Sequence, residues 1–102
     1  MPRYVTDAML AGLAKELRTR KIDCETIHKV LLGHEDSRVK ISDPKILKYL
    51  KEHNGSVTLI TADSELAEYC SVEGLPCIRV QDIVADYIAS ASGPPRGQLF
   101  TR

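Results

Sequence analysis

The sequence has few of the side chains that mark several common functional classes. It contains no tryptophan and a single phenylalanine among 102 residues, so it offers little aromatic surface on which single-stranded bases can stack. Its 14 basic and 14 acidic side chains cancel, and a neutral chain has no overall electrostatic attraction to nucleic acid. Contact with a nucleic acid would therefore depend on a local basic patch.

Long apolar segments are also missing. No run approaches the roughly 20 residues needed to span a bilayer, and residues 1–4 lack the apolar core of a signal peptide. The three cysteines, Cys24, Cys70 and Cys77, have neither the even number of a disulfide framework nor the spacing of metal ligands. These absences predict a cytoplasmic protein with reduced thiols and no membrane segment.

Several catalytic motifs do not occur either. The three histidines show neither HxH nor HExxH spacing, and there is no glycine-rich phosphate loop. A receiver-like phosphoacceptor needs an acidic pair after the first strand and a lysine after the last, which this chain lacks. A haloacid-dehalogenase-like phosphatase carries a second aspartate where Met9 stands. The sequence therefore argues against both of these phosphoryl-transfer classes.

What the chain does contain is a regular alternation of strand and helix patterns. Short apolar or β-branched segments predict strands at 3–6, 24–27, 57–60 and 77–80. Apolar residues at helical spacing predict helices over 8–19, from Asp43 to Asn54, after Asp63, and over 82–91. Residues 28–42 are predicted to form a loop, and residues 92–102 a flexible tail.

This order of elements predicts an α/β fold. A single domain over residues 1–91 would hold a four-stranded parallel sheet between two layers of helices. Right-handed crossovers restrict the topology, and we expect the strand order 2-1-3-4 with a switch point between strands 1 and 3. Ligand sites in open parallel sheets form beyond the carboxyl ends of the strands at such a switch point.

Carboxylates far apart in the sequence are predicted to meet at this edge. Asp7 follows the first strand, Asp63 follows the third, and Asp43 opens the helix that leads to the third strand. Glu65, in the first turn of the next helix, is placed to lean toward the same crevice. Clustered carboxylates repel one another, and hard oxygen ligands suit Mg²⁺ or Mn²⁺. Such a cation lowers the pKa of a bound water and shields a phosphate, which is the chemistry of phosphodiester hydrolysis.

Helix capping is the simpler explanation for each aspartate taken alone. Aspartate is among the commonest N-cap residues, and Asp7, Asp43 and Asp63 all stand at predicted helix starts, as does Asp82. Only the predicted convergence of the first three on one crevice favours a metal site over separate caps.

Three segments of the chain also carry a family resemblance. Residues 4–10 (YVTDAML), residues 42–47 (SDPKIL) and residues 59–66 (LITADSEL) follow one another at compatible spacings. Together they resemble the acidic segments of small PIN-like domains, as found at the C-terminus of exonuclease-related proteins. The resemblance covers roughly residues 3–80.

The resemblance implies a metal-dependent nuclease, most often a ribonuclease, that uses Mg²⁺ or Mn²⁺. Asp7, Asp43 and Asp63 would be its catalytic metal ligands. It also implies a homodimer and, because many PIN domains are toxins, an antitoxin as protein partner. Larger PIN domains carry a further acidic residue on a helix for which this chain has no room. A catalytically inactive PIN-like binding or assembly module is therefore the alternative function.

Other residues have supporting roles in this hypothesis. Thr61 is predicted to hydrogen-bond a ligand carboxylate or the attacking water. Arg38, Lys40 and Lys45 are candidate contacts to the phosphates of a single-stranded RNA. Basic residues in such a stripe more often lie on a solvated helix face, so this role depends on where the structure places them.

Overall fold

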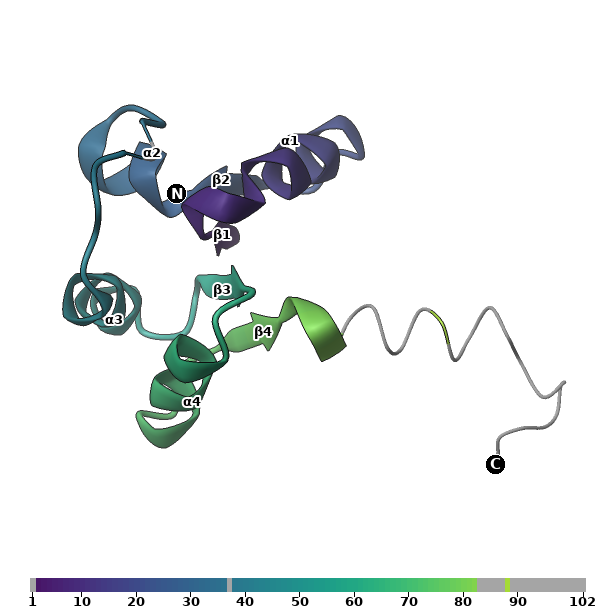
Figure 1. Ribbon diagram of the computed structural model, residues 1–102. Coiled ribbons are helices and arrows are strands. Elements are labelled where there is room, and N and C mark those ends of the chain that lie inside the picture. Colours follow the sequence, from purple (N-terminus) through teal and green to yellow (C-terminus); the bar gives the residue numbers. More distant parts are fainter. Residues whose placement is uncertain (1, 37, 83–87, 89–102) are drawn as a thin grey trace, which may run out of the picture.

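A four-stranded parallel sheet forms the centre of the protein (Figure 1). The computed structural model describes residues 2–36, 38–82 and 88. The strands are β1 (Tyr4–Thr6), β2 (Cys24–Thr26), β3 (Thr58–Thr61) and β4 (Cys77–Arg79). They are ordered β2-β1-β3-β4, and all neighbouring pairs are parallel. The predicted fold class and strand order are therefore confirmed, with the switch point between β1 and β3.

Helices lie on both sides of the sheet (Figure 1). One side carries α1 (Ala11–Thr19), which follows the short 3-10 helix η1 (Ala8–Leu10). The other side carries α2 (Ile27–Leu32), α3 (Asp43–Glu52) and α4 (Ser64–Val72). The predicted three-layer arrangement is therefore present, and the helix predicted over 8–19 begins with a 3-10 turn.

The main core lies between the sheet and the layer of α3 and α4. It contains the buried side chains of Val5, Ile27, Ile46, Leu50, Val57, Leu59, Leu66 and Cys70. Successive strand residues point to opposite faces of a sheet, so the neighbours of Val5 and Leu59 face α1 instead. Tyr4 and Ile60 line an apolar cavity of about 230 Å³ on that side, together with Leu13 and Leu17 of the α1 segment.

The segment predicted as a loop over 28–42 contains the helix α2, so this prediction was wrong in its first part. The hydroxyl of Thr26 accepts a hydrogen bond from the backbone N–H of Lys29 at 3.1 Å and caps the helix. Gly33 ends it in a left-handed conformation with φ 81°. The helix is too short to show an apolar period, although both of its end signals stand in the sequence.

Replacing Thr26 with alanine is expected to lower the free energy of unfolding by about 1–2 kcal/mol, because it removes this cap. The Thr26 hydroxyl is buried and also donates a hydrogen bond to Glu35 at 3.3 Å. Thr26→Ser keeps the hydroxyl and is the matched control. Urea unfolding measures the difference, and equal stability of the alanine and serine variants would contradict the prediction.

The later elements agree with the sequence patterns as far as the structure describes them. Asn54 (φ 47°) and Gly55 (φ 84°) follow the end of α3 in the left-handed region. The chain is helical at 80–82, but most of the helix predicted over 82–91 and the whole tail 92–102 lie outside the described residues. Among the described helices, none has the length and apolarity to cross a membrane.

Candidate functional site

The three predicted aspartates line one pocket at the carboxyl-terminal edge of the sheet. Asp7 follows β1, Asp63 follows β3 and Asp43 begins α3, and all three border a cavity of about 340 Å³. Apolar side chains, including the core residues Ile46 and Leu66, form much of the rest of its wall. The structure thus brings together three acidic residues that are up to 56 positions apart in the sequence.

Asp7 does not act as a helix cap. It stands at the N-cap position of η1 but makes no side-chain hydrogen bond there. Its Oδ2 instead accepts hydrogen bonds from the hydroxyl of Thr61 and, at 3.3 Å, from the backbone N–H of Ala62. The Thr61 hydroxyl accepts in turn from the backbone N–H of Asp63 at 3.0 Å. This chain of hydrogen bonds ties the Asp7 carboxylate to the end of β3 across the switch point, and Thr61 contacts a carboxylate as predicted.

The environment of Asp7 disfavours its ionised form. Burial raises the pKa of Asp7 above the ordinary value, and the nearby charges of Asp63 and Asp43 raise it further. The hydrogen bonds from Thr61 and Ala62 act in the opposite direction without cancelling the rise. A positive charge in the pocket would reverse this imbalance, because it favours the carboxylate form.

Asp63 and Asp43 fit the capping explanation more closely. The Oδ1 atom of Asp63 accepts hydrogen bonds from the backbone N–H groups of Glu65 at 2.9 Å and Leu66 at 3.3 Å. Asp63 is therefore the N-cap of α4. Asp43 is the first residue of α3, where the helix dipole stabilises a negative charge. Within the described chain neither the Oδ2 of Asp63 nor the Asp43 carboxylate makes a hydrogen bond.

The fit of these residues to a metal ion is partial. The described residues contain no group of three or more histidine, cysteine, aspartate or glutamate side chains that could hold a cation. Glu65, predicted as a further ligand, borders a neighbouring cavity between α3 and α4 rather than the pocket of Asp7. Mg²⁺, however, usually binds through one or two carboxylates and keeps several waters. A hydrated ion of this kind would need the carboxylates of only one or two of the three aspartates.

The predicted phosphate contacts are spread over a wider surface than expected. Lys40 borders the aspartate pocket. Lys45 lies with Lys40 along a separate groove between α2 and α3, and the exposed Arg38 pairs with Asp36 at 2.9 Å. Only one of the three basic residues thus lines the pocket that holds the aspartates.

His28 is a pocket residue that no sequence motif singled out. Its side chain is 6% exposed, and its Nε2 donates a hydrogen bond to the carbonyl oxygen of Val39. Its Nδ1 has no partner among the described residues. The signal that identifies it is topological, because His28 follows β2 and therefore stands at the same edge of the sheet as Asp7 and Asp63.

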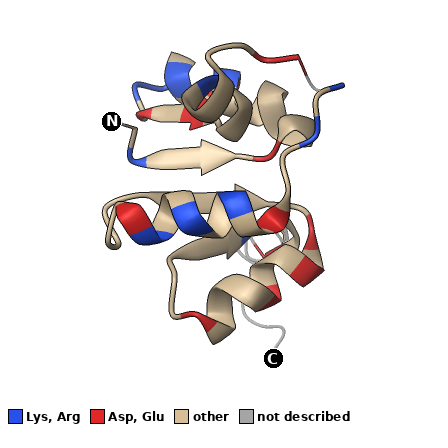
Figure 2. Cartoon of the chain, turned by 90° about the vertical axis from the view of Figure 1, so that its left-hand side faces the viewer, with Lys and Arg blue, Asp and Glu red and all other residues tan. Residues whose placement is uncertain are grey.

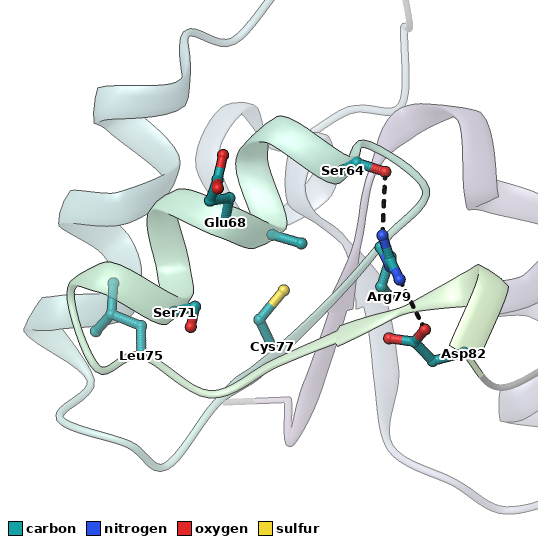
Figure 3. A pocket seen from close by; sticks show the side chains of 8 residues that line it. Ser64, Glu68, Ser71, Leu75, Cys77, Arg79 and Asp82 are labelled. Carbon is teal, nitrogen blue, oxygen red and sulfur yellow. Dashed lines mark hydrogen bonds and ion pairs between the residues drawn. The ribbon is translucent and has the colours of Figure 1, made fainter.

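A larger cavity, of about 560 Å³, lies between α4 and β4 (Figure 3). Arg79 at the end of β4 donates hydrogen bonds to Ser64 at 3.5 Å and to the carboxylate of Asp82 at 2.9 Å. Burial, and then the adjacent Cys70, raise the pKa of the Cys77 thiol to about 12, so it is a poor nucleophile at neutral pH. This cavity offers no activated thiol, and the aspartate pocket is the stronger candidate for a reactive site.

Comparisons of this chain with protein-family models, with curated proteins and with solved structures find no match. The fold and the pocket therefore carry the evidence for its function.

Proposed function

We propose that this protein is a metal-dependent nuclease, and specifically a ribonuclease. It would hydrolyse the phosphodiester bonds of RNA at the pocket lined by Asp7, Asp43 and Asp63. The observation that carries the proposal is the placement of Asp7. Its carboxylate caps no helix, is recessed from solvent, and is held at the switch point by Thr61 and Ala62. A carboxyl group with a raised pKa beside two further acids, in a pocket at this edge, is an arrangement typical of functional sites.

The residues of the pocket would have separate roles in such a reaction. Mg²⁺ or Mn²⁺ would supply an activated water and shield the phosphate. Thr61 fixes one oxygen of the Asp7 carboxylate, which orients the other oxygen as a ligand. Lys40 places a positive charge at the rim, where it attracts a phosphate group. Much of the remaining wall is apolar, and His28 is a further polar residue that lines it.

The cellular setting follows from the same proposal. The three cysteines are free thiols, which fits the reducing cytoplasm where RNA substrates occur. Because many of the PIN domains that the sequence resembles are toxins, the proposal extends to an antitoxin as protein partner.

Cleavage of a mixed-sequence single-stranded RNA tests the proposal. The wild-type protein is compared in Mn²⁺ and in EDTA, and Asp63→Asn is compared in Mn²⁺. Asparagine is as good an N-cap as aspartate, so this variant removes the charge and keeps the fold. We expect cleavage by the wild type in Mn²⁺ only, with a loss of about tenfold or more in the variant.

Asp23→Asn is the matched control, since Asp23 is exposed and precedes β2 at the opposite edge of the sheet. It should cleave at the wild-type rate. Equal cleavage in EDTA, or by Asp63→Asn, would overturn the proposed catalytic site.

A non-catalytic PIN-like binding or assembly module is the second candidate. One observation favours it: the part of the chain that the structure describes holds no ready-made group of three metal ligands. Thermal melting with and without millimolar Mn²⁺ separates the two functions. A bound cation raises the melting temperature by mass action, whereas an unchanged melting temperature supports the module.

A further inference from the structure

The segment that joins α2 to α3 passes the carboxyl-terminal edge of the sheet, where the aspartate pocket lies (Figure 2). Three consecutive residues of this segment, Val39, Lys40 and Ile41, border the pocket. The same three residues border the groove between α2 and α3. Lys40 is the only lysine or arginine among the described residues that line the pocket. The position of this segment therefore decides where the pocket has its positive charge.

The hydrogen bonds within this segment shape a turn without attaching it to the sheet. The backbone N–H of Val39 donates to the carbonyl oxygen of Asp36 at 3.1 Å. The side chain of Arg38 donates to the carboxylate of Asp36 at 2.9 Å. Both bonds join near neighbours in the sequence, so they cannot hold the turn against the rest of the protein.

The side chain of His28 makes that attachment from α2. Its ring is 6% exposed, and its Nε2 donates a hydrogen bond to the carbonyl oxygen of Val39. A carbonyl oxygen only accepts hydrogen bonds, so the proton of the ring is on Nε2. Within the described chain, no other hydrogen bond joins residues 38–41 to a helix or to the sheet. His28 is thus the polar anchor of this part of the segment.

Lys40 consequently lies between two fixed points of the backbone. On one side Val39 is held by His28, and on the other side Ile41 packs against the hydrophobic core. The side chain of Lys40 itself is exposed and free to meet a ligand. A backbone that is already ordered loses less conformational entropy when the ligand binds, so affinity is higher than for a mobile loop.

We propose that His28 is a positioning residue of the candidate site. By holding the carbonyl oxygen of Val39, it keeps Lys40 at the rim of the pocket, where the ammonium group binds a phosphate of the substrate. This role rests on the proposed nuclease function and adds a residue that need not touch the RNA. Because His28 acts through Lys40, its loss should weaken substrate binding and spare the chemical step.

Two substitutions of His28 separate its hydrogen bond from its bulk. His28→Leu removes the donor and fills much of the space, whereas His28→Gln offers an N–H donor on a side chain of similar reach. In RNA cleavage with Mn²⁺ we expect His28→Leu to raise KM about tenfold with kcat nearly unchanged, since the rim must then be ordered at each binding event. His28→Gln should restore most of the wild-type KM.

A double variant tests whether His28 acts through Lys40. Lys40→Ala alone should raise KM, and adding His28→Leu to it should raise KM little further, because the two changes remove the same contact. His53→Leu removes a histidine at the opposite end of α3 and is the matched control, with KM and kcat as in the wild type. Circular dichroism checks that each variant is folded.

Hydrogen exchange tests the same role without any cleavage. Mass spectrometry of peptides that cover Val39 and Lys40 should show faster exchange in His28→Leu than in the wild type, and near-normal exchange in His28→Gln. Equal exchange in all three proteins would overturn the proposal, as would a rise in KM that is as large with Lys40→Ala as without it. A wild type that cleaves no RNA but shows the expected exchange would overturn the nuclease function and still support the placement of Lys40 by His28.

Discussion

An Asp7→Asn variant is expected to lose RNA cleavage by about 10²–10³-fold and yet to unfold at a higher temperature than the wild type when no metal is present. Asparagine has nearly the same shape as aspartate, and its amide oxygen still accepts hydrogen bonds from Thr61 and Ala62. The variant removes only the negative charge. Cleavage falls because a neutral amide is a weaker ligand for a hard cation than a carboxylate.

The gain in stability follows from the direction in which folding shifts the pKa of Asp7. Burial, with a further contribution from Asp63 and Asp43, raises this pKa in the folded protein above the ordinary value of 3.8. The unfolded chain therefore gives up this proton at lower pH than the folded chain does, and ionisation of Asp7 lowers the free energy of unfolding. The loss begins near the ordinary pKa and is complete once the pH lies above the raised one.

Thermal melts in EDTA from about pH 4 to above neutrality measure this effect, starting near the ordinary aspartate pKa. The difference between Asp7→Asn and the wild type should widen with pH and then level off. Mn²⁺ should raise the melting temperature of the wild type alone and narrow the difference. A variant less stable than the wild type at pH 7 would show that the Asp7 carboxylate stabilises the fold, as a purely structural residue would.

The topology of this protein was predictable because its local signals agree with one another. The segment 57–60 is apolar and β-branched, and it becomes the buried strand β3. Ser42 and Pro44 mark the start of α3, and Asp63 marks that of α4. Once four strands alternate with helices, right-handed crossovers leave little choice of strand order. The meeting of Asp7 and Asp63 at one edge follows from that order alone.

The distinction between a cap and a site residue was not predictable in the same way. Asp7 and Asp63 both follow a strand and precede a helical turn, so the sequence presents them alike. Their difference lies in long-range hydrogen bonds: Asp63 turns back on its own helix, whereas Asp7 reaches Thr61 across 54 positions. Contacts of this kind depend on side-chain placement in the folded core, which local patterns do not encode.

A Leu59→Ala variant is expected to lose about 3 kcal/mol of unfolding free energy. Leu59 is fully buried in β3, a central strand, with Val5 of β1 on one side and Cys77 of β4 on the other. Its face of the sheet packs against both α3 and α4. A cavity enclosed by a sheet and two helices closes poorly, because no single element can move in to fill it. For a domain of this size the loss is a large fraction of the roughly 5–15 kcal/mol available.

Two control variants test whether this loss of unfolding free energy comes from the cavity in the core. Leu59→Met keeps the volume and should cost less than about 1.5 kcal/mol, and Met9→Ala, at a residue 75% exposed, should change stability by less than about 0.5 kcal/mol. Urea unfolding of the three variants measures the series. Because Thr61 lies two residues after Leu59 on the same strand, a cavity here also loosens the hydrogen bond that holds Asp7. If Leu59→Ala lowered the free energy of unfolding as little as Met9→Ala does, the core would not be holding β3 firmly. The packing of β3 would then not explain the fixed position of Asp7 that the proposed site requires.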